Sequence, residues 1–320
     1  MGDDVTGLHH VGHLVQDLDQ AMERYRRLGF TVPAPACPVL PPVAGGRPEP
    51  FGVANTHVYF PGNFVELVAV IDDAGRLPGQ ARPIPLLVPD DKLPALTAAI
   101  RATAANITFF LRRFQGVHIM IANTPDIDGV AARLTAGGVG HGGVHAVQRP
   151  VETATGTRME PARYLEISDP DLPPGRVPEG RIGFAENTTA EPLDDRRHLD
   201  HPNGATGLVE CVLCVADPAL PELERRYGTY FGQARGGEVL RFDQANVTVV
   251  PASALADLLP GERPAALPAF VAYTVSVRDL AATERLLRGN DVPVTRTGPG
   301  RLFVPAAAAL GTAIIFRQDD

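Results

Sequence analysis

The chain has 320 residues, a formal net charge of -8 and three cysteines. A length of this order favours two domains or one large domain. The acidic balance and the scarcity of lysine argue against a nucleic-acid partner, because no basic stripe is present to neutralise phosphates. The sequence shows no apolar run of membrane-spanning length and no signal peptide. We therefore expect a cytoplasmic protein, monomeric or homodimeric, that binds a small molecule and no membrane.

The first predicted elements form a strand–helix–strand–strand–strand unit. A Val/Leu-rich strand over 8–15 leads into Asp17, and aspartate is a favoured helix N-cap. The helix that follows has an apolar stripe at helical spacing, made of Leu18, Met22, Tyr25 and Leu28. A short strand then opens at 30–32, and a loop rich in proline and glycine follows it. Two strands, over 56–60 and 64–70, then complete the order βαβββ.

The pattern is interrupted and then repeated. Residues 71–115 are an insertion with a helix from Leu93 to about Ala104, which either covers a cleft or forms a surface connection. Cys211 and Cys214 lie in a later Val/Leu strand, where an odd separation puts them on opposite faces, so we expect small buried hydrophobes. The sequence predicts an N-terminal pair of units over 1–188 (units 7–70 and 116–187), a linker over 189–205 and a C-terminal pair over 206–320.

One segment recurs along the chain. The stretch from Gly7 to Asp17 returns from Gly207 to Asp217, and fainter echoes begin at Gly116 and Pro268. Repeated units of this kind bury their apolar faces against one another. The first copy carries histidines and the second carries none, so we expect the chemistry in the N-terminal pair and a structural role for the C-terminal pair.

Three short motifs resemble one known superfamily. The opening strand His10-Val11-Gly12-His13-Leu14, the helix-to-strand passage Arg26-Arg27-Leu28-Gly29-Phe30 and the later strand Phe64-Val65-Glu66-Leu67 resemble the vicinal-oxygen-chelate superfamily, with its glyoxalase and bleomycin-resistance members. The resemblance covers nearly the whole chain. It implies an α+β fold of four βαβββ units in two pairs. The fold hosts isomerases, lyases, dioxygenases and binding proteins, so it leaves the reaction open.

The resemblance also implies a metal site. In such families two units form a cupped sheet, and the first and last strands of each unit supply the ligands of a divalent metal. Carried over to this chain, those ligands are His10 and Glu66 from the first unit and His118 and Glu186 from the second. Glu166 on a neighbouring strand competes with Glu186. Imidazole and carboxylate ligands suit Fe, Mn, Zn or Ni.

Strand parity bears on the histidines. Along one strand His10 shares a face with Gly12, whereas His9 and His13 share the other face. The alternative register makes His9 and His13 the ligands; otherwise His13 is a core histidine with a backbone partner. Glu66 stands in an apolar run, where an unpaired carboxylate is costly, so it needs a metal or an arginine as partner.

Four further side chains are candidates for substrate contacts. His57 and Tyr59 alternate onto one strand face and are placed to hydrogen-bond the ligands. Arg112 and Arg113 either hold a substrate carboxylate or are solvated.

Three functions follow from these residues. The first is a metal-dependent isomerase or lyase, in which the metal stabilises an enolate and Glu66 or Glu186 moves the proton. The second is an extradiol-type Fe(II) dioxygenase, since two histidines and one carboxylate suit Fe(II). The third is a metal-free protein that binds a small molecule, such as a drug-resistance protein.

Overall fold

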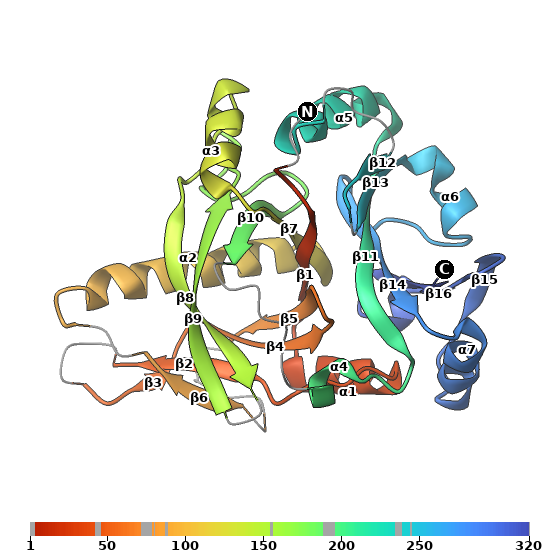
Figure 1. The fold of residues 1–320 in the computed structure, drawn as a ribbon, viewed down its shortest axis with the longest axis horizontal. Helices are drawn as coiled ribbons and strands as arrows, with labels where there is room; N and C mark the ends of the chain where they lie inside the picture. The colour runs from red at the N-terminus through yellow and green to blue at the C-terminus, as the bar shows by residue number, and fades with distance from the viewer. Residues whose placement is uncertain are drawn as a thin grey trace.

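Two β-sheets stand side by side in the computed structural model (Figure 1). It describes residues 4–41, 46–71, 79, 81–86, 89–153, 156–187, 196–233, 239–243 and 245–319. The N-terminal sheet consists of β1 (Gly7–Leu14), β2 (Ala36–Leu40), β3 (Glu49–Pro50), β4 (Val53–Tyr59), β5 (Phe64–Val70), β6 (Arg82–Pro85), β7 (Gly116–Asn123), β8 (His145–Thr153), β9 (Gly156–Glu166) and β10 (Arg181–Asn187). The C-terminal sheet consists of β11 (Ala205–Val215), β12 (Val239–Arg241), β13 (Asn246–Pro251), β14 (Ala269–Val277), β15 (Thr295–Gly298), β16 (Arg301–Val304) and β17 (Ala313–Gln318).

The helices complete this α+β architecture. They are α1 (Leu18–Arg27), α2 (Leu93–Leu111), α3 (Ile127–Ala136), α4 (Arg196–Leu199), α5 (Leu220–Tyr230), α6 (Leu255–Leu258) and α7 (Leu280–Gly289), with short 3-10 turns at Asp217–Ala219, Ala252–Ala254 and Ala306–Ala308. Within the described ranges, no helix has both the length and the apolar character that a membrane span requires.

Both sheets share one central arrangement, which is the arrangement of paired βαβββ units. In the N-terminal sheet β1 runs parallel to β5 and antiparallel to β7, and β7 runs parallel to β10. In the C-terminal sheet β11, β13, β14 and β17 repeat these relations. The two sheets meet where β1 lies beside β11 (Figure 1). Of the linker predicted over 189–205, residues 196–204 include α4 and lead into β11, which begins at Ala205, and 188–195 lie outside the described residues.

The repeated aspartates start the helices, as the sequence predicts for Asp17. Its carboxylate accepts a hydrogen bond of 3.0 Å from the backbone N–H of Gln20. Asp126 and Asp279 cap α3 and α7 through bonds of 2.9 Å to the N–H groups three residues on. In the third unit Asp217 instead accepts from the backbone N–H of Ser253. The aspartate that ends the recurring motif is therefore an N-cap in the first, second and fourth units.

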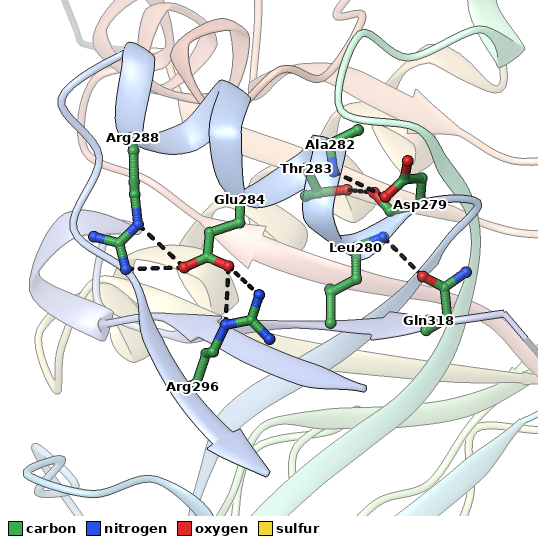
Figure 2. Close-up of polar contacts among 8 residues, drawn as sticks. All are labelled: Asp279, Leu280, Ala282, Thr283, Glu284, Arg288, Arg296 and Gln318. Carbon is green, nitrogen blue, oxygen red and sulfur yellow. Dashed lines mark hydrogen bonds and ion pairs between the residues drawn. The ribbon is translucent and has the colours of Figure 1, made fainter. Parts of the chain in front are cut away.

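The last helix shows how such a unit is fixed to its sheet (Figure 2). Besides the Asp279 cap, the side chain of Gln318 on β17 accepts a 2.8 Å hydrogen bond from the backbone N–H of Leu280. Glu284 lies between Arg288 on its own helix and Arg296 on β15 and pairs with both (Figure 2). α7 is thus tied to two strands of the C-terminal sheet.

One hydrophobic core joins the two sheets on the faces that carry α1, α3, α5 and α7. Strand alternation sends Val11 and Val65 into this core, while His10 and Glu66 face the opposite way, into a concave cup. The C-terminal sheet has its own cup, which apolar side chains and α6 fill. Cys211 is buried in the shared core and Cys214 in that second cluster, which confirms the expected opposite faces.

The insertion contributes to the N-terminal cup. Its helix α2 continues to Leu111, several residues beyond the predicted end, and runs across the sheet (Figure 1). Ile107 and Phe110 of this helix are buried against Leu14 and Ile119 on the concave face. α2 therefore covers one end of the cup and limits the space left for a ligand. Residues 72–78, 80 and 87–88 of the insertion lie outside the described residues.

Candidate functional site

The uncovered part of the N-terminal cup is a cavity of about 400 Å³. Volumes of this size suit one small molecule. Its wall comes mainly from β4, β5, β1, β7, β10 and β9, with residues of β2, β6 and β8 at its edges, so residues distant in the chain meet there. The lining is mainly apolar, with histidines, carboxylates and arginines at a few places.

The strand register places the polar residues in two rows across the concave face. The first row, in spatial order, is His57, Glu66, Gly12, Ile119 and Arg181. The second row is Tyr59, Phe64, His10, Ile121, Gly183 and Glu166. The predicted residues His10 and Glu66 therefore lie on adjacent strands and face the same cavity.

A β-bulge brings a second histidine to the cavity. Leu8 pairs with Ala122 and His10 pairs with the adjacent Ile121, so His9 is an extra residue in β1. As a result His9 and His10 both line the cavity, and their Nδ1 atoms are 2.7 Å apart in a hydrogen bond. The prediction that His9 lies on the opposite face from His10 is wrong, because the bulge breaks the alternation.

His13 does lie on the opposite face, where it is completely buried. Its Nε2 donates a 2.8 Å hydrogen bond to the carbonyl oxygen of Leu310, and its Nδ1 accepts one from the hydroxyl of Tyr25. The expectation of a core histidine with a backbone partner is confirmed. His9 and His13 are not brought together, so the alternative ligand pair does not form.

Glu66 and His10 are both fixed by neighbours. The side-chain amide of Asn55 on β4 donates a 2.8 Å hydrogen bond to Oε1 of Glu66. The ring of His10 stacks on Phe64 at a centroid distance of 4.6 Å. Burial, followed by the charges of His9, His57 and Arg181, lowers the pKa of His10 well below its usual value. The His10 imidazole is therefore neutral at neutral pH.

His118 is placed by the same kind of bulge but is covered. It is the extra residue of β7, next to Ile119. Phe110 and Phe114 enclose its ring at centroid distances of 5.3 and 4.1 Å, and its Nε2 donates to the Phe114 carbonyl oxygen. Burial lowers the pKa of His118 to about 4. The structure places His118 beneath α2, apart from the cavity.

Glu186 is also placed elsewhere. One of its carboxylate oxygens, Oε2, accepts a 2.9 Å hydrogen bond from the backbone N–H of Ile127, the first residue of α3, and lies 3.4 Å from Arg163. Such a carboxylate satisfies and stabilises a helix N-terminus. Its competitor Glu166 lines the cavity instead, where it pairs with Arg181.

The predicted substrate contacts divide into two groups. His57 and Tyr59 line the cavity, and His57 Nδ1 lies 3.0 Å from the Tyr59 hydroxyl. Arg112 is exposed outside the cavity. Arg113 donates to the carbonyl oxygens of Pro178 and Pro268, so it ties α2 to neighbouring loops.

The residues that the sequence did not reveal are Asn55, Arg181 and the cavity-facing His9. Asn55 has a signal in the sequence, since it alternates with His57 and Tyr59 along one strand. Arg181 precedes the predicted strand by one residue and alternates with Gly183. The bulge at His9 has no local sequence signal.

The predicted metal ligands do not converge as a set of four. His10 and Glu66 meet at the cavity, whereas His118 and Glu186 have other partners. Across the described part of the chain, no three His, Cys, Asp or Glu side chains are arranged to hold a metal ion. The residues present thus do not fit the metal centre that the sequence predicts.

Comparisons with known proteins give a family and a fold. A family model described as a glyoxalase-like domain matches residues 8–231. No curated protein matches the chain. A hypothetical protein from Staphylococcus aureus has a similar structure, with a TM-score of 0.58 and 11% identity, covering 98% of this chain and 100% of that one.

Two enzymes also share the fold. A mutant of 4-hydroxymandelate synthase from Streptomyces coelicolor has a TM-score of 0.54 and 14% identity, covering 98% of this chain and 93% of that one. The Mn(II)-bound glyoxalase from Novosphingobium aromaticivorans has a TM-score of 0.50 and 10% identity, covering 98% of this chain and 82% of that one. At these identities the likeness concerns the fold alone.

Proposed function

Because the chain belongs to the glyoxalase-like domain family of the vicinal-oxygen-chelate superfamily, we propose that its cavity is the active site of an isomerase or lyase. The substrate is a small molecule with two neighbouring oxygens, and the reaction moves a proton next to a carbonyl group. The observation that carries this proposal is the placement of His10 and Glu66 on adjacent strands facing one cavity.

Glu66 is the general base in this proposal. A base must be held within hydrogen-bond reach of the proton that it removes. Asn55 holds Oε1, and no described residue donates to Oε2. The carboxylate takes a proton from the carbon beside the carbonyl, the C–H electron pair forms a C=C bond, and the carbonyl oxygen becomes an enolate oxygen. Return of the proton to the former carbonyl carbon gives an isomer, as the neighbouring hydroxyl becomes the new carbonyl and its proton passes to the enolate oxygen. Alternatively, the enolate re-forms its carbonyl, a C=C bond forms to the β-carbon and the β-substituent leaves with its bonding electron pair, which gives a lyase product.

The histidine pair supplies a hydrogen-bond donor for the enolate oxygen. The Nδ1 atoms of His9 and His10 are 2.7 Å apart in a hydrogen bond. Because burial keeps the His10 ring neutral, His10 carries its own proton on Nε2 when its Nδ1 accepts this bond. His10 then presents an Nε2–H group to the cavity, and fixed donors of this kind stabilise a developing oxyanion.

Two of the predicted functions require more metal ligands than His10 and Glu66. These are the metal-dependent form of this chemistry, with Fe, Mn, Zn or Ni, and the extradiol-type dioxygenase. Sites for such metals use three or more protein ligands. Of the predicted ligands the cavity offers His10 and Glu66, while Glu166 is paired with Arg181. His9 and His57 also line it, but no three His, Cys, Asp or Glu side chains in the described part of the chain are arranged to hold a metal ion. The Mn(II)-bound glyoxalase has this fold, but we assign the proton transfer here to side chains of the chain itself.

A second candidate is a small-molecule binding or resistance protein without catalysis. It is favoured by the apolar part of the cavity wall, which includes Phe64, Ile119 and Ile121. Apolar walls with few polar groups are typical of ligand pockets in general. This candidate predicts ligand binding with no proton exchange.

Solvent deuterium exchange tests the two candidates. The wild type is incubated in D2O with small 2-hydroxy ketones and 2-oxo acids, and the loss of carbon-bound hydrogen is followed by NMR. We expect Glu66→Gln to slow the exchange by about 100-fold or more, the usual contribution of a general base. Glu186→Gln is the matched control and should exchange as the wild type does. Undiminished exchange in Glu66→Gln would contradict the proposal, and tight binding without exchange would favour the second candidate.

A further inference from the structure

We propose that Ile119 and Gly183 occupy the positions of the second unit's metal ligands and that the cavity is consequently a metal-free site. The two units of the N-terminal sheet correspond residue by residue. β1 begins at Gly7 and β7 at Gly116, both strands have 8 residues, and the caps Asp17 and Asp126 follow them at the same distance. This correspondence takes His10 to Ile119, and it takes His9, the bulged residue, to the bulged His118.

The strand ladders identify the counterpart of Glu66. Glu66 on β5 pairs with Gly12 on β1. The counterpart of Gly12 is Ile121 on β7, which pairs with Gly183 on β10. Gly183 therefore stands where the second unit would place its carboxylate. Neither isoleucine nor glycine has a side chain that binds a metal.

Both positions are also closed by packing. A Cβ atom on Gly12 would lie 2.7 Å from Cβ and 2.8 Å from Cδ1 of Ile119, so this side chain already fills the space above Gly12. Gly12 is the ladder partner of Glu66 and is two residues from His10. A Cβ atom on Gly183 would lie 2.3 Å from the carbonyl oxygen of Leu165, which leaves no room for a carboxylate there. Hydrocarbon thus occupies the centre of the four strands.

The charges in the cavity also disfavour a bound metal ion. Arg181 lies next to Ile119 in the first row and lines the cavity. A fixed guanidinium repels a divalent cation, more strongly in a partly enclosed site than in water. Glu166, the other carboxylate facing the cavity, is paired with this arginine. Of the four predicted ligands, His10 and Glu66 remain at the cavity, beside a positive charge. His9 and His57 also line it, with their Nδ1 atoms hydrogen-bonded to His10 and to the Tyr59 hydroxyl, and no three His, Cys, Asp or Glu side chains among the described residues are arranged to hold a metal ion.

Metal binding itself tests the inference, with Mn²⁺ and Zn²⁺ as probes. Wild type, Ile119→His and Ile119→Leu are dialysed against each metal, freed of unbound metal and measured by elemental mass spectrometry. We expect substoichiometric metal in the wild type and in Ile119→Leu. Ile119→His supplies a third ligand beside His10 and Glu66, and we expect about tenfold or more bound metal, as for other changes around a metal site. Adding His10→Ala should remove this gain.

Two results would overturn the inference. One is stoichiometric Mn²⁺ or Zn²⁺ in the wild type that His10→Ala removes. The other is the absence of any gain in an Ile119→His variant whose circular dichroism matches the wild type. No substrate enters these measurements, so their outcome is independent of the proton-transfer proposal, which the deuterium exchange tests separately.

Discussion

Acidification should destabilise the protein through two buried histidines, His13 and His118. Both are completely buried, and burial lowers both pKa values to about 4. The Phe114 carbonyl opposes this shift at His118, and the charge of Arg113 adds to it. Protonation of His13 would require its Nδ1 to donate, although it now accepts from Tyr25.

The sign and size of the effect follow from linkage. In the unfolded chain a histidine titrates near pH 6.5, so below that pH the unfolded state binds more protons than the folded state. The stabilising contribution is present above pH 6.5 and is lost as the pH falls toward 4. A gap of about 2.5 units corresponds to about 3 kcal/mol per histidine at full protonation, and to about 2 kcal/mol at pH 5. Two histidines thus remove about 4 kcal/mol between pH 7 and pH 5, a large share of a typical stability of about 5–15 kcal/mol.

Urea unfolding at pH 7 and pH 5 measures this loss. His118→Phe keeps an aromatic ring between Phe110 and Phe114 but cannot titrate, so its loss of unfolding free energy should be smaller than that of the wild type by about 2 kcal/mol. Leu134→Ala is the control, because it should lower stability by about 3 kcal/mol at both pH values. An unchanged pH dependence in His118→Phe would refute the reasoning.

Three further substitutions test the packing around the site and between the halves. Glu179 is fully buried and accepts from Arg226 and Tyr227, so Glu179→Gln should cost about 3–5 kcal/mol in urea unfolding, because it leaves the charge of Arg226 without its opposite charge. A loss below about 1 kcal/mol would contradict this. Phe110→Ala should cost about 3–5 kcal/mol in the same assay, because it opens a void beneath α2, and an unchanged midpoint would argue against that cover. A Cβ atom on Gly311 would lie 1.8 Å from the Gln115 carbonyl oxygen, so Gly311→Ala should lower Tm by several degrees. Gly289→Ala is the control: its Cβ atom would lie in open space, so its Tm should not fall.

The fold could be predicted because its signals are local and repeated. Asp17 caps a helix and Tyr25 lies on the buried face of that helix, as spacing alone indicated. The family assignment to residues 8–231 and the shared fold of solved structures confirm the superfamily resemblance. α2 extends past its predicted end because Ile107 and Phe110 are buried against the cup, a tertiary contact that helical periodicity does not encode.

The site could be predicted in part. His10 and Glu66 face the cavity, as the motifs indicated, but the bulge at His9 depends on how β1 pairs with a strand more than a hundred residues away. Glu186 lies at a helix N-terminus and not at the predicted metal site, because it accepts a hydrogen bond from the backbone N–H of Ile127 there. The sequence also contains a signal against His118 as a ligand. Ile119 precedes Asp126 by the same number of residues as His10 precedes Asp17, so Ile119 is the counterpart of His10.

Deuterium exchange on metal-depleted protein tests the central claim most directly. Wild type is dialysed exhaustively against chelator, its metal content is measured, and exchange of small 2-hydroxy ketones and 2-oxo acids in D2O is followed by NMR on the same sample. We predict exchange that persists without metal and is lost in Glu66→Gln. Exchange that disappears on chelation and returns with Mn²⁺ would contradict this claim.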